Sequence, residues 1–590
     1  MENGDNGKRK CKRFKEIIFK RIHILQWLPQ YTKLDAVSDV IAGITLGLTM
    51  MPQSMAYATL ANLPAQYGLY SAFIGSFIYV FFGTIKEVSI GPTSLMALLT
   101  LSVCRDLPIE FVILLCFLSG CVELIMGILR LGFLVDFISV PVVSGFTSAT
   151  SVIIIMAQLK GLLGIKYNSQ GIIDWAYKLY LHINKITLGD SLLGIACMIF
   201  LIAFKQLPKI KVKSETSKKI LWLFSIGRNA LIVLLTSLLA CYFEQKWGKV
   251  PFKIYGNITR GIPDFKPPQF STKMGNETLS FIDMVGMLGS GVIIVPVIAV
   301  LANVAIAKSF AAGKIVDATQ EMVTLGLCNI LGSFVQSMPA TGAFTRSAVS
   351  NASGVRTPMA GLYSGTIILL ALTFLTPYFY YVPSATLAAV LISAVMFMVD
   401  YEIIPKLWKI NKFDMMVTIA TFCASLAYGV ELGLVFGVII SLIPLLKMWT
   451  RPKIKSQTIA LQSGEMCLLL ELQVGFLFPA VDYFTQETVK ILNNFEKMHI
   501  SVVIIDFSTV LRLDYSSMQS LQNLQKTLKK MSITTKFINV SEEVSAALEK
   551  YYRKDELVFC YSDSGKLLEN SYKISFSKTN LNEQLPLLNC

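Results

Sequence analysis

The chain has 590 residues, of which 54% are hydrophobic and only 15% are charged. Soluble domains usually contain about 25% charged residues, so this composition excludes an ordinary soluble protein and indicates one that crosses a membrane several times. A net charge of +15 can indicate nucleic-acid binding, but here the basic residues gather where apolar segments end, which is the positive-inside pattern and argues against a nucleic-acid partner.

The start of the chain, residues 1–37, is strongly charged and has no early apolar core. We therefore expect a cytosolic N-terminal region and not a signal peptide. The three histidines and eleven cysteines show no spacing typical of a metal site or a disulfide framework, so no cofactor is expected. No pair of nucleophile and base and no phosphate-binding glycine loop is recognisable, which argues against an enzyme.

The first apolar span covers about residues 40–63 and carries Pro52, Gln53 and Tyr57. A central proline removes a backbone hydrogen bond and kinks the helix. Gln53 and Tyr57 are four residues apart, so they share one helix face. Polar side chains on one face of a spanning helix indicate either a lined cavity or hydrogen bonds to a neighbouring helix, and both interpretations are open here.

A second span is expected at residues 67–83, after which Gly91 and Pro92 interrupt the chain. The apolar run from Thr93 to Val103 has about eleven residues, whereas a crossing helix needs about twenty. The run is therefore predicted to be a half-helix that begins at membrane depth. Further spans are expected at residues 109–129, 138–163, 192–205 and 220–243.

The basic stretch at residues 205–219 is expected on the cytosolic side of the membrane, so the hydrophilic loop at 244–279 should lie outside, one span later. Two sequons in this loop make Asn257 and Asn276 candidate glycosylation sites. The sequons agree with the predicted orientation.

The second half of the chain repeats the order of the first. A long span at residues 281–307 and another at 322–335 precede a broken segment, Ser337–Gly354. Short, interrupted segments at equivalent positions of two halves are the best sequence indication of a transporter site near the midplane. Thr93 and Thr345 head the two half-helices. The last spans are expected at residues 361–376, 384–398, 413–428 and 432–446.

Arg346 is a cation inside the second broken segment. An arginine near the bilayer centre costs at least about 2.5–3.5 kcal/mol, so it usually faces protein or water. It could reach a lipid headgroup or pair with a carboxylate. The favoured interpretation is an anion site.

Beyond Arg451 the sequence alternates between strand and helix patterns, which predicts a separate α/β domain. Strands are expected at residues 467–472, 501–508 and 534–540, and helices at 516–530 and 542–551. The tail, residues 571–590, is expected to be disordered and contains an acidic dileucine pattern from Glu583 to Leu588. This pattern makes endosomal or lysosomal membranes an expected location beside the cell membrane.

Four motifs, in this order, resemble the sulfate permease family, also called solute carrier family 26: PQSMAYA (52–58), SIGPTSLM (89–96), ATGAFTRSAVSNASGVRTPMAG (340–361) and IDFSTVLRLDYSS (505–517). The resemblance implies a polytopic α-helical membrane protein with fourteen transmembrane segments in two inverted repeats of seven, at about residues 38–243 and 280–447 of a transport domain that spans 38–450. It also implies core and gate parts that move against each other, a cytosolic STAS domain at 451–570, cytosolic termini and a homodimer.

The resemblance implies a secondary transporter of sulfate, chloride, bicarbonate or oxalate. The family's anion pocket falls on residues of three segments, namely Gln53, Tyr57, Thr93, Phe344, Thr345 and Arg346. A helix N-terminus behaves like about half a positive charge, so two facing half-helices supply about one unit and Arg346 adds another. The alternatives are a channel-like or voltage-responsive chloride-conducting protein and a membrane scaffold.

One position departs from the family pattern. The sulfate-transporting relatives tend to have a glutamate six residues before the lysine of an AxAK motif. Here that lysine is Lys308, the position is Ala302, and its neighbour is Asn303. A buried carboxylate is the usual means of proton coupling, so its absence predicts anion exchange or uncoupled anion transport without a proton. The resemblance further implies that the exchange is independent of sodium.

In the C-terminal domain, Asp506, Asp514 and Ser516 resemble the pattern around the phosphorylated serine of bacterial anti-sigma factor antagonists. The favoured interpretation is structural: the end of a strand and a helix cap formed by Asp514.

Overall fold

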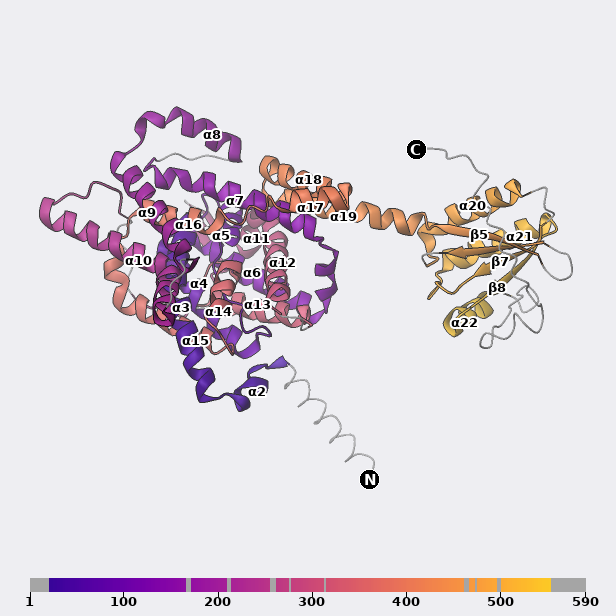
Figure 1. The fold of residues 1–590 in the computed structure, drawn as a ribbon, viewed down its shortest axis with the longest axis horizontal. Coiled ribbons are helices and arrows are strands. Elements are labelled where there is room, and N and C mark those ends of the chain that lie inside the picture. The colour runs from indigo at the N-terminus through magenta and orange to yellow at the C-terminus, as the bar shows by residue number, and fades with distance from the viewer. Residues whose placement is uncertain are drawn as a thin grey trace, which may run out of the picture. The chain divides into compact units, whose positions relative to one another are not determined.

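The computed structural model describes residues 21–165, 171–209, 214–254, 261–274, 277–311, 315–460, 466–472, 475–495 and 500–552. The chain divides into two compact units, residues 1–440 and 441–590 (Figure 1). The candidate glycosylation sites Asn257 and Asn276 and the tail at 571–590 lie outside the described residues.

The first half of the first unit contains helices close to the predicted spans. They are α2 (Ile24–Trp27), α3 (Lys33–Leu60), α4 (Ala65–Phe82), the strand β1 (Ile90–Gly91), α5 (Ser94–Val103), α6 (Ile109–Ile128), α7 (Val140–Leu162), α8 (Gly171–Leu181), α9 (Leu188–Gln206) and α10 (Glu215–Trp247). The half-helix predicted at residues 93–103 is confirmed as α5. Thr93 is its N-cap, because its side chain accepts a hydrogen bond from the backbone N–H of Met96.

The second half repeats the order. It contains the strands β2 (Thr272–Met274) and β3 (Glu277–Leu279), then α11 (Phe281–Leu288), α12 (Gly291–Phe310), α13 (Ala318–Ser333), the strand β4 (Thr341–Gly342), α14 (Phe344–Ala352), α15 (Ala360–Leu370), α16 (Ser384–Val395), α17 (Ile403–Ile410), α18 (Lys412–Tyr428) and α19 (Val430–Thr450). The continuous span predicted at 281–307 is wrong. Gly289 separates α11 from α12 with a φ of +53°, a backbone conformation that favours glycine.

The helices α3, α4, α6, α7, α9, α10, α12 and α19 of the described chain contain stretches long and apolar enough to cross a membrane, which makes eight candidate spans. The helices α5, α15 and α16 are shorter apolar helices. The count of fourteen segments therefore stays a prediction.

The two broken segments meet at a pair of short strands that the sequence analysis did not predict. Strands β1 and β4 are antiparallel, with Ile90 opposite Gly342 and Gly91 opposite Thr341. A half-helix follows each strand, so α5 and α14 start on either side of one central strand pair and run apart. Their N-termini therefore lie near each other.

Helix packing divides the first unit into two groups. One group joins α3, α4, α6, α12, α13 and α15, and the other joins α7, α9, α10, α16 and α18, while α3 also packs against α10 and α16 of the second group. In the first group α6 and α13 approach closely at glycines: a Cβ on Gly120 would lie 2.6 Å from the backbone nitrogen of Ile330, and one on Gly326 would lie 2.7 Å from that of Leu124. Small residues allow such backbone contact between membrane helices.

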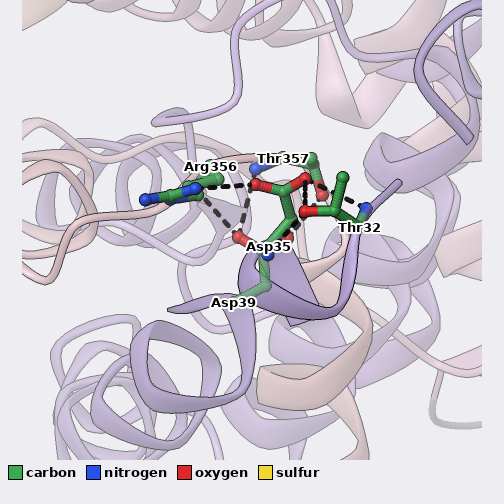
Figure 2. Close-up of polar contacts among 5 residues, drawn as sticks. All are labelled: Thr32, Asp35, Asp39, Arg356 and Thr357. Atoms are coloured by element: carbon green, nitrogen blue, oxygen red, sulfur yellow. Dashed lines mark hydrogen bonds and ion pairs between the residues drawn. The ribbon is translucent and has the colours of Figure 1, made fainter. Parts of the chain in front are cut away.

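A polar cluster joins the start of α3 to the segment between α14 and α15 (Figure 2). The buried carboxylate of Asp39 accepts hydrogen bonds from the backbone N–H of Arg356 (2.8 Å) and of Thr357 (3.1 Å), and from the Thr357 hydroxyl (2.5 Å). Asp35 forms an exposed ion pair with Arg356 at 3.2 Å. Asp39 thus holds the chain at the far end of the α14 half-helix.

Replacing Asp39 by alanine is expected to destabilise the transport unit. The change orphans two backbone donors and one hydroxyl, at about 1–3 kcal/mol for each buried group that finds no water. Arg356→Gln is the control, since an exposed ion pair contributes about 0–1 kcal/mol. Thermal unfolding of the purified full chain measures both. Equal melting temperatures for the two variants would contradict the role of Asp39.

The second unit is an α/β domain (Figure 1). Its sheet has the order β5 (Ile454–Ala460), β6 (Met466–Leu472), β7 (Ile500–Asp506) and β8 (Thr534–Ile538), with the helices α20 (Val481–Asn494), α21 (Tyr515–Lys530) and α22 (Glu542–Tyr551). Strands β6, β7 and β8 are parallel, and β5 is antiparallel to β6. The predicted strands and helices are present, whereas β5 and α20 were not predicted.

Asp514 caps α21 in this domain, as predicted. It accepts hydrogen bonds from the backbone N–H of Ser517 and of Phe478, both at 2.8 Å. Burial acts to raise the pKa of Asp514, but these hydrogen bonds outweigh it and lower the pKa below its usual value. Asp506 accepts hydrogen bonds from the Ser508 backbone N–H (2.8 Å) and the Asn539 side chain (3.1 Å).

Candidate functional site

A cavity of about 740 Å³ lies between the two helix groups of the first unit. The first group contributes residues of α3 and α12, and the second contributes residues of α7, α10 and α16. The segments around the β1–β4 strand pair, Lys205 of α9 and the residues that follow α16 also contribute to the wall. Five of the six predicted site residues line this cavity: Gln53, Tyr57, Thr93, Phe344 and Thr345.

Arg346 lies behind the cavity wall. Its side chain is 0% exposed, and its Nη1 donates a hydrogen bond to the carbonyl oxygen of Pro92 at 2.7 Å. A Cβ on Gly91 would lie 3.2 Å from Nη2 of the arginine. The guanidinium is thus packed against the chain that joins β1 to α5, and it does not reach a lipid headgroup.

The charge of Arg346 has no carboxylate partner in the described part of the chain. Its Nε and Nη2 atoms are buried and have no hydrogen-bond partner there. A buried guanidinium with one neutral acceptor is expensive, because Coulomb attraction does not offset its desolvation. The arrangement therefore favours a negatively charged ligand close by.

The two half-helices present their N-termini at this cavity. Thr93 caps α5, and Thr345 is the second residue of α14. Ala343, the N-cap of α14, makes no side-chain capping bond, so the first-turn N–H groups of α14 have no acceptor from a cap. Such groups, together with the helix dipole, attract anions.

Gln53 and Tyr57 face the cavity from α3, although they are only 3% and 4% exposed. The side-chain oxygen Oε1 of Gln53 has no hydrogen-bond partner among the described residues. This observation favours the cavity interpretation of Gln53 over the helix–helix interpretation. Phe344 is 49% exposed, and its ring lies 5.4 Å from that of Phe310.

Ala302 also lines the cavity. Its neighbour Asn303 points elsewhere, because its Nδ2 donates a hydrogen bond to Oε2 of Glu321 at 2.8 Å. A carboxylate at position 302 would therefore face the space in which an anion is expected, whereas Asn303 belongs to the packing between α12 and α13.

Two buried carboxylates escaped the sequence analysis. Glu321 accepts hydrogen bonds from the Tyr79 hydroxyl (3.1 Å) and the Thr84 backbone N–H (3.1 Å), and Glu123 accepts one from the Asn329 amide (2.8 Å). Both glutamates are 0% exposed, and neither lines the cavity. A charged residue inside the apolar span predicted at 109–129 was the signal that could have revealed Glu123, whereas Glu321 directly precedes the span predicted at 322–335.

Further residues of the cavity wall were also missed as site residues. They are Lys205, Arg228, Asn229 and Asp400. Arg228 lies inside the span predicted at residues 220–243, so the argument used for Arg346 applied to it as well.

The chain is similar to known proteins over both units. The profile of the sulfate permease family matches residues 37–421, and that of the STAS domain matches 458–565. The chain is 38% identical to the sodium-independent sulfate anion transporter of Bos taurus, covering 92% of this chain and 90% of that protein. It is 30% identical to the probable sulfate transporter 3.3 of Arabidopsis thaliana, covering 90% and 87%.

Solved structures show the same fold. The murine Solute Carrier 26 family member A9 anion transporter, in its inward-facing state, has a TM-score of 0.78 at 21% identity and covers 91% of each chain. The transmembrane domain of a cyanobacterium bicarbonate transporter has a TM-score of 0.54 at 17% identity, covering 70% of this chain and 98% of that one. The predicted class, a polytopic α-helical membrane protein with a C-terminal α/β STAS domain, is confirmed.

Proposed function

The chain belongs to the sulfate permease family of multi-pass membrane transporters, and on this premise we propose that it moves sulfate by alternating access, with chloride, bicarbonate or oxalate as exchange partners. We propose that the exchange is independent of sodium and is not coupled to protons. The family consists of transporters and not of enzymes.

The uncompensated charge of Arg346 is the observation that carries this proposal. The arginine is fully buried beside Gly91 and Pro92, directly behind the starts of α5 and α14. Two helix N-termini and one guanidinium supply about two positive units. That charge balances one divalent anion, and it leaves about one positive unit uncompensated when a monovalent anion is bound. Gln53, Tyr57, Thr93, Phe344 and Thr345 are proposed to contact the anion in the cavity.

The names of relatives support sulfate as a substrate. The bovine relative is named for sodium-independent sulfate transport, and the Arabidopsis relative is named as a probable sulfate transporter. The neighbour of similar fold is named as a bicarbonate transporter. Exchange without a proton is proposed because Ala302 offers no ionisable group to the cavity.

Alternating access is proposed to move the α3–α4–α6–α12–α13–α15 group against the α7–α9–α10–α16–α18 group, with the cavity between them. Lys205 at the end of α9 lines the cavity, and the basic stretch that it begins is proposed to be cytosolic, so this form would open inward. We further propose that the transport domain covers residues 38–450 and the STAS domain covers residues 451–570. Both termini are proposed to be cytosolic, and the protein is proposed to form a homodimer. It is proposed to reside in the cell membrane, with an endosomal or lysosomal pool.

Flux measurements on the full chain in reconstituted vesicles test the function. Uptake of labelled sulfate is expected to rise when chloride or oxalate is present inside, and to be indifferent to sodium and proton gradients. An absence of sulfate flux under every gradient would contradict the proposal. A large chloride conductance without sulfate flux would instead identify the channel-like alternative.

A further inference from the structure

The cavity has a second positively charged wall, formed by α9 and α10. Lys205 near the end of α9 and Arg228 and Asn229 of α10 all line it. These helices belong to the packing group opposite α3 and α12. The helices that form this wall are therefore different from α14, which carries Arg346, and from the segment before α5, against which Arg346 packs.

Arg228 is held in place by its own helix. Its Nη1 donates a hydrogen bond to the carbonyl oxygen of Ser225 at 2.7 Å, whereas its Nε is buried and has no hydrogen-bond partner among the described residues. No ion pair joins Arg228 to a carboxylate in that part of the chain. Like Arg346, it is a cation in an apolar span without a neutralising acid nearby.

Asn229 is a second incomplete polar group on this wall. It is only 4% exposed, and its side-chain oxygen has no hydrogen-bond partner among the described residues. The two ends of an amide are assigned from their partners, so the Asn229 side chain can turn either its oxygen or its N–H₂ donors to the cavity. A buried amide facing a cavity with an unmet hydrogen bond indicates a polar ligand.

Two other charged residues, Lys205 and Asp400, line the same cavity. The Nζ of Lys205 lies 3.0 Å from the ring centroid of Phe397, which itself lines the cavity. The Asp400 carboxylate accepts a hydrogen bond from the Ser144 hydroxyl at 3.1 Å. Arg228, Lys205 and Asp400 are the charged side chains among the described residues that line the cavity, and their formal charges sum to +1.

We infer that Arg228 and Asn229 form a second anion-binding position on α10, with Lys205 as a further cation of the same cavity wall, and that this position holds the transported inorganic anion before it reaches the position in front of Arg346. This inference rests on the proposed function. A cation in a wide cavity raises the local concentration of anions, and its effect is screened by salt. The second position therefore controls the apparent affinity for the anion and how that affinity depends on ionic strength. The negative charge of Asp400 repels the anion and so lowers this affinity.

The test is the KM for labelled sulfate in vesicles that contain the full chain. Arg228→Gln and Lys205→Gln are each expected to raise the KM about three- to thirtyfold, with little change in maximal rate. This range corresponds to a Coulomb attraction that is stronger than in bulk water and weaker than in a dry protein interior. The increase should be smaller for a monovalent anion and smaller at high salt. Asp400→Asn is expected to lower the KM, because it removes a negative charge that repels the anion. This effect is opposite to that of the Arg228 and Lys205 variants.

The control is Lys246→Gln. Lys246 is an exposed residue of the same helix α10 whose Nζ donates a hydrogen bond to the Tyr242 hydroxyl, and it does not line the cavity. Its KM and salt dependence should equal those of the unmodified protein. Arg228→Lys, which keeps the charge, should restore much of the affinity that Arg228→Gln loses.

The outcomes separate this inference from the proposed function. If Arg346→Gln loses sulfate flux while Arg228→Gln keeps both the KM and its salt dependence, the second position is wrong and the proposed function stands. If the unmodified chain moves no anion, the proposed function itself fails. If Arg228→Gln does not fold, Asp400→Asn decides, because an unchanged or higher KM overturns the inference.

Discussion

Replacing Arg346 by glutamine is expected to abolish most sulfate transport and to impair divalent anions more than monovalent ones. A unit charge about 7 Å from an anion, at an effective dielectric constant of about 20, contributes about 2.4 kcal/mol for a monovalent and about 4.7 kcal/mol for a divalent anion. The loss of affinity is thus about fiftyfold for chloride and above about a thousandfold for sulfate. Competition of sulfate and chloride for uptake in reconstituted vesicles measures this difference.

The Arg346 variant should fold, because no carboxylate loses a partner when the guanidinium leaves. Among the described residues, the carbonyl of Pro92 is the acceptor that loses a hydrogen bond from the arginine side chain. Arg356→Gln is the matched control: the same substitution ten residues later removes an exposed cation that pairs with Asp35 at 3.2 Å. Sulfate flux in Arg346→Gln equal to that of the control would remove the central claim about the site.

Replacing Ala302 by glutamate is expected to make anion flux depend strongly on pH. The new carboxylate would face the cavity, where it repels the substrate when ionised and does not when protonated. Flux should therefore be low at neutral pH and rise as the pH falls, by about tenfold or more for a repulsion of about 1.4 kcal/mol. An inward proton gradient should then drive sulfate uptake.

Ala302→Gln is the control for this variant, since it adds nearly the same volume without an ionisable group. Its flux should respond to pH as the unmodified protein does. The measurement is labelled sulfate uptake into vesicles at several external pH values with the internal pH held fixed. If Ala302→Glu and Ala302→Gln respond alike, the proposed reason for proton-free transport is wrong.

The half-helix α5 could be predicted because the apolar run that follows Gly91 and Pro92 is too short to cross a bilayer. The cap by Asp514 could be predicted because an aspartate immediately before a helical pattern can accept a hydrogen bond from a first-turn N–H. Both are local effects, which depend on residues a few positions apart. The break at Gly289 was missed because long apolar stretches flank the triplet Gly289, Ser290 and Gly291, although such a triplet is itself a turn signal.

The central strand pair shows what local patterns cannot reveal. Two-residue strands carry no periodicity, and β1 and β4 become recognisable only when Ile90 meets Gly342 across the fold. The hydrogen bond between Asp39 and Thr357 likewise could not be predicted from local patterns, because the two residues are far apart in the sequence. Arg228 carried the signal of a charge in an apolar span, but only the tertiary structure showed that it lines the cavity and does not merely pack against a neighbouring helix.

The sequence by itself determined the membrane class, the two interrupted half-helices, the presence of an arginine in the second of them and the α/β domain. Composition, segment length and capping are properties of neighbouring residues, and they act before any long-range contact forms. The tertiary structure alone decided that Arg346 lies behind the cavity wall with its charge unpaired and that α9 and α10 add a second positive wall. Charge compensation depends on which distant groups packing brings within a few ångströms, and no local pattern records that.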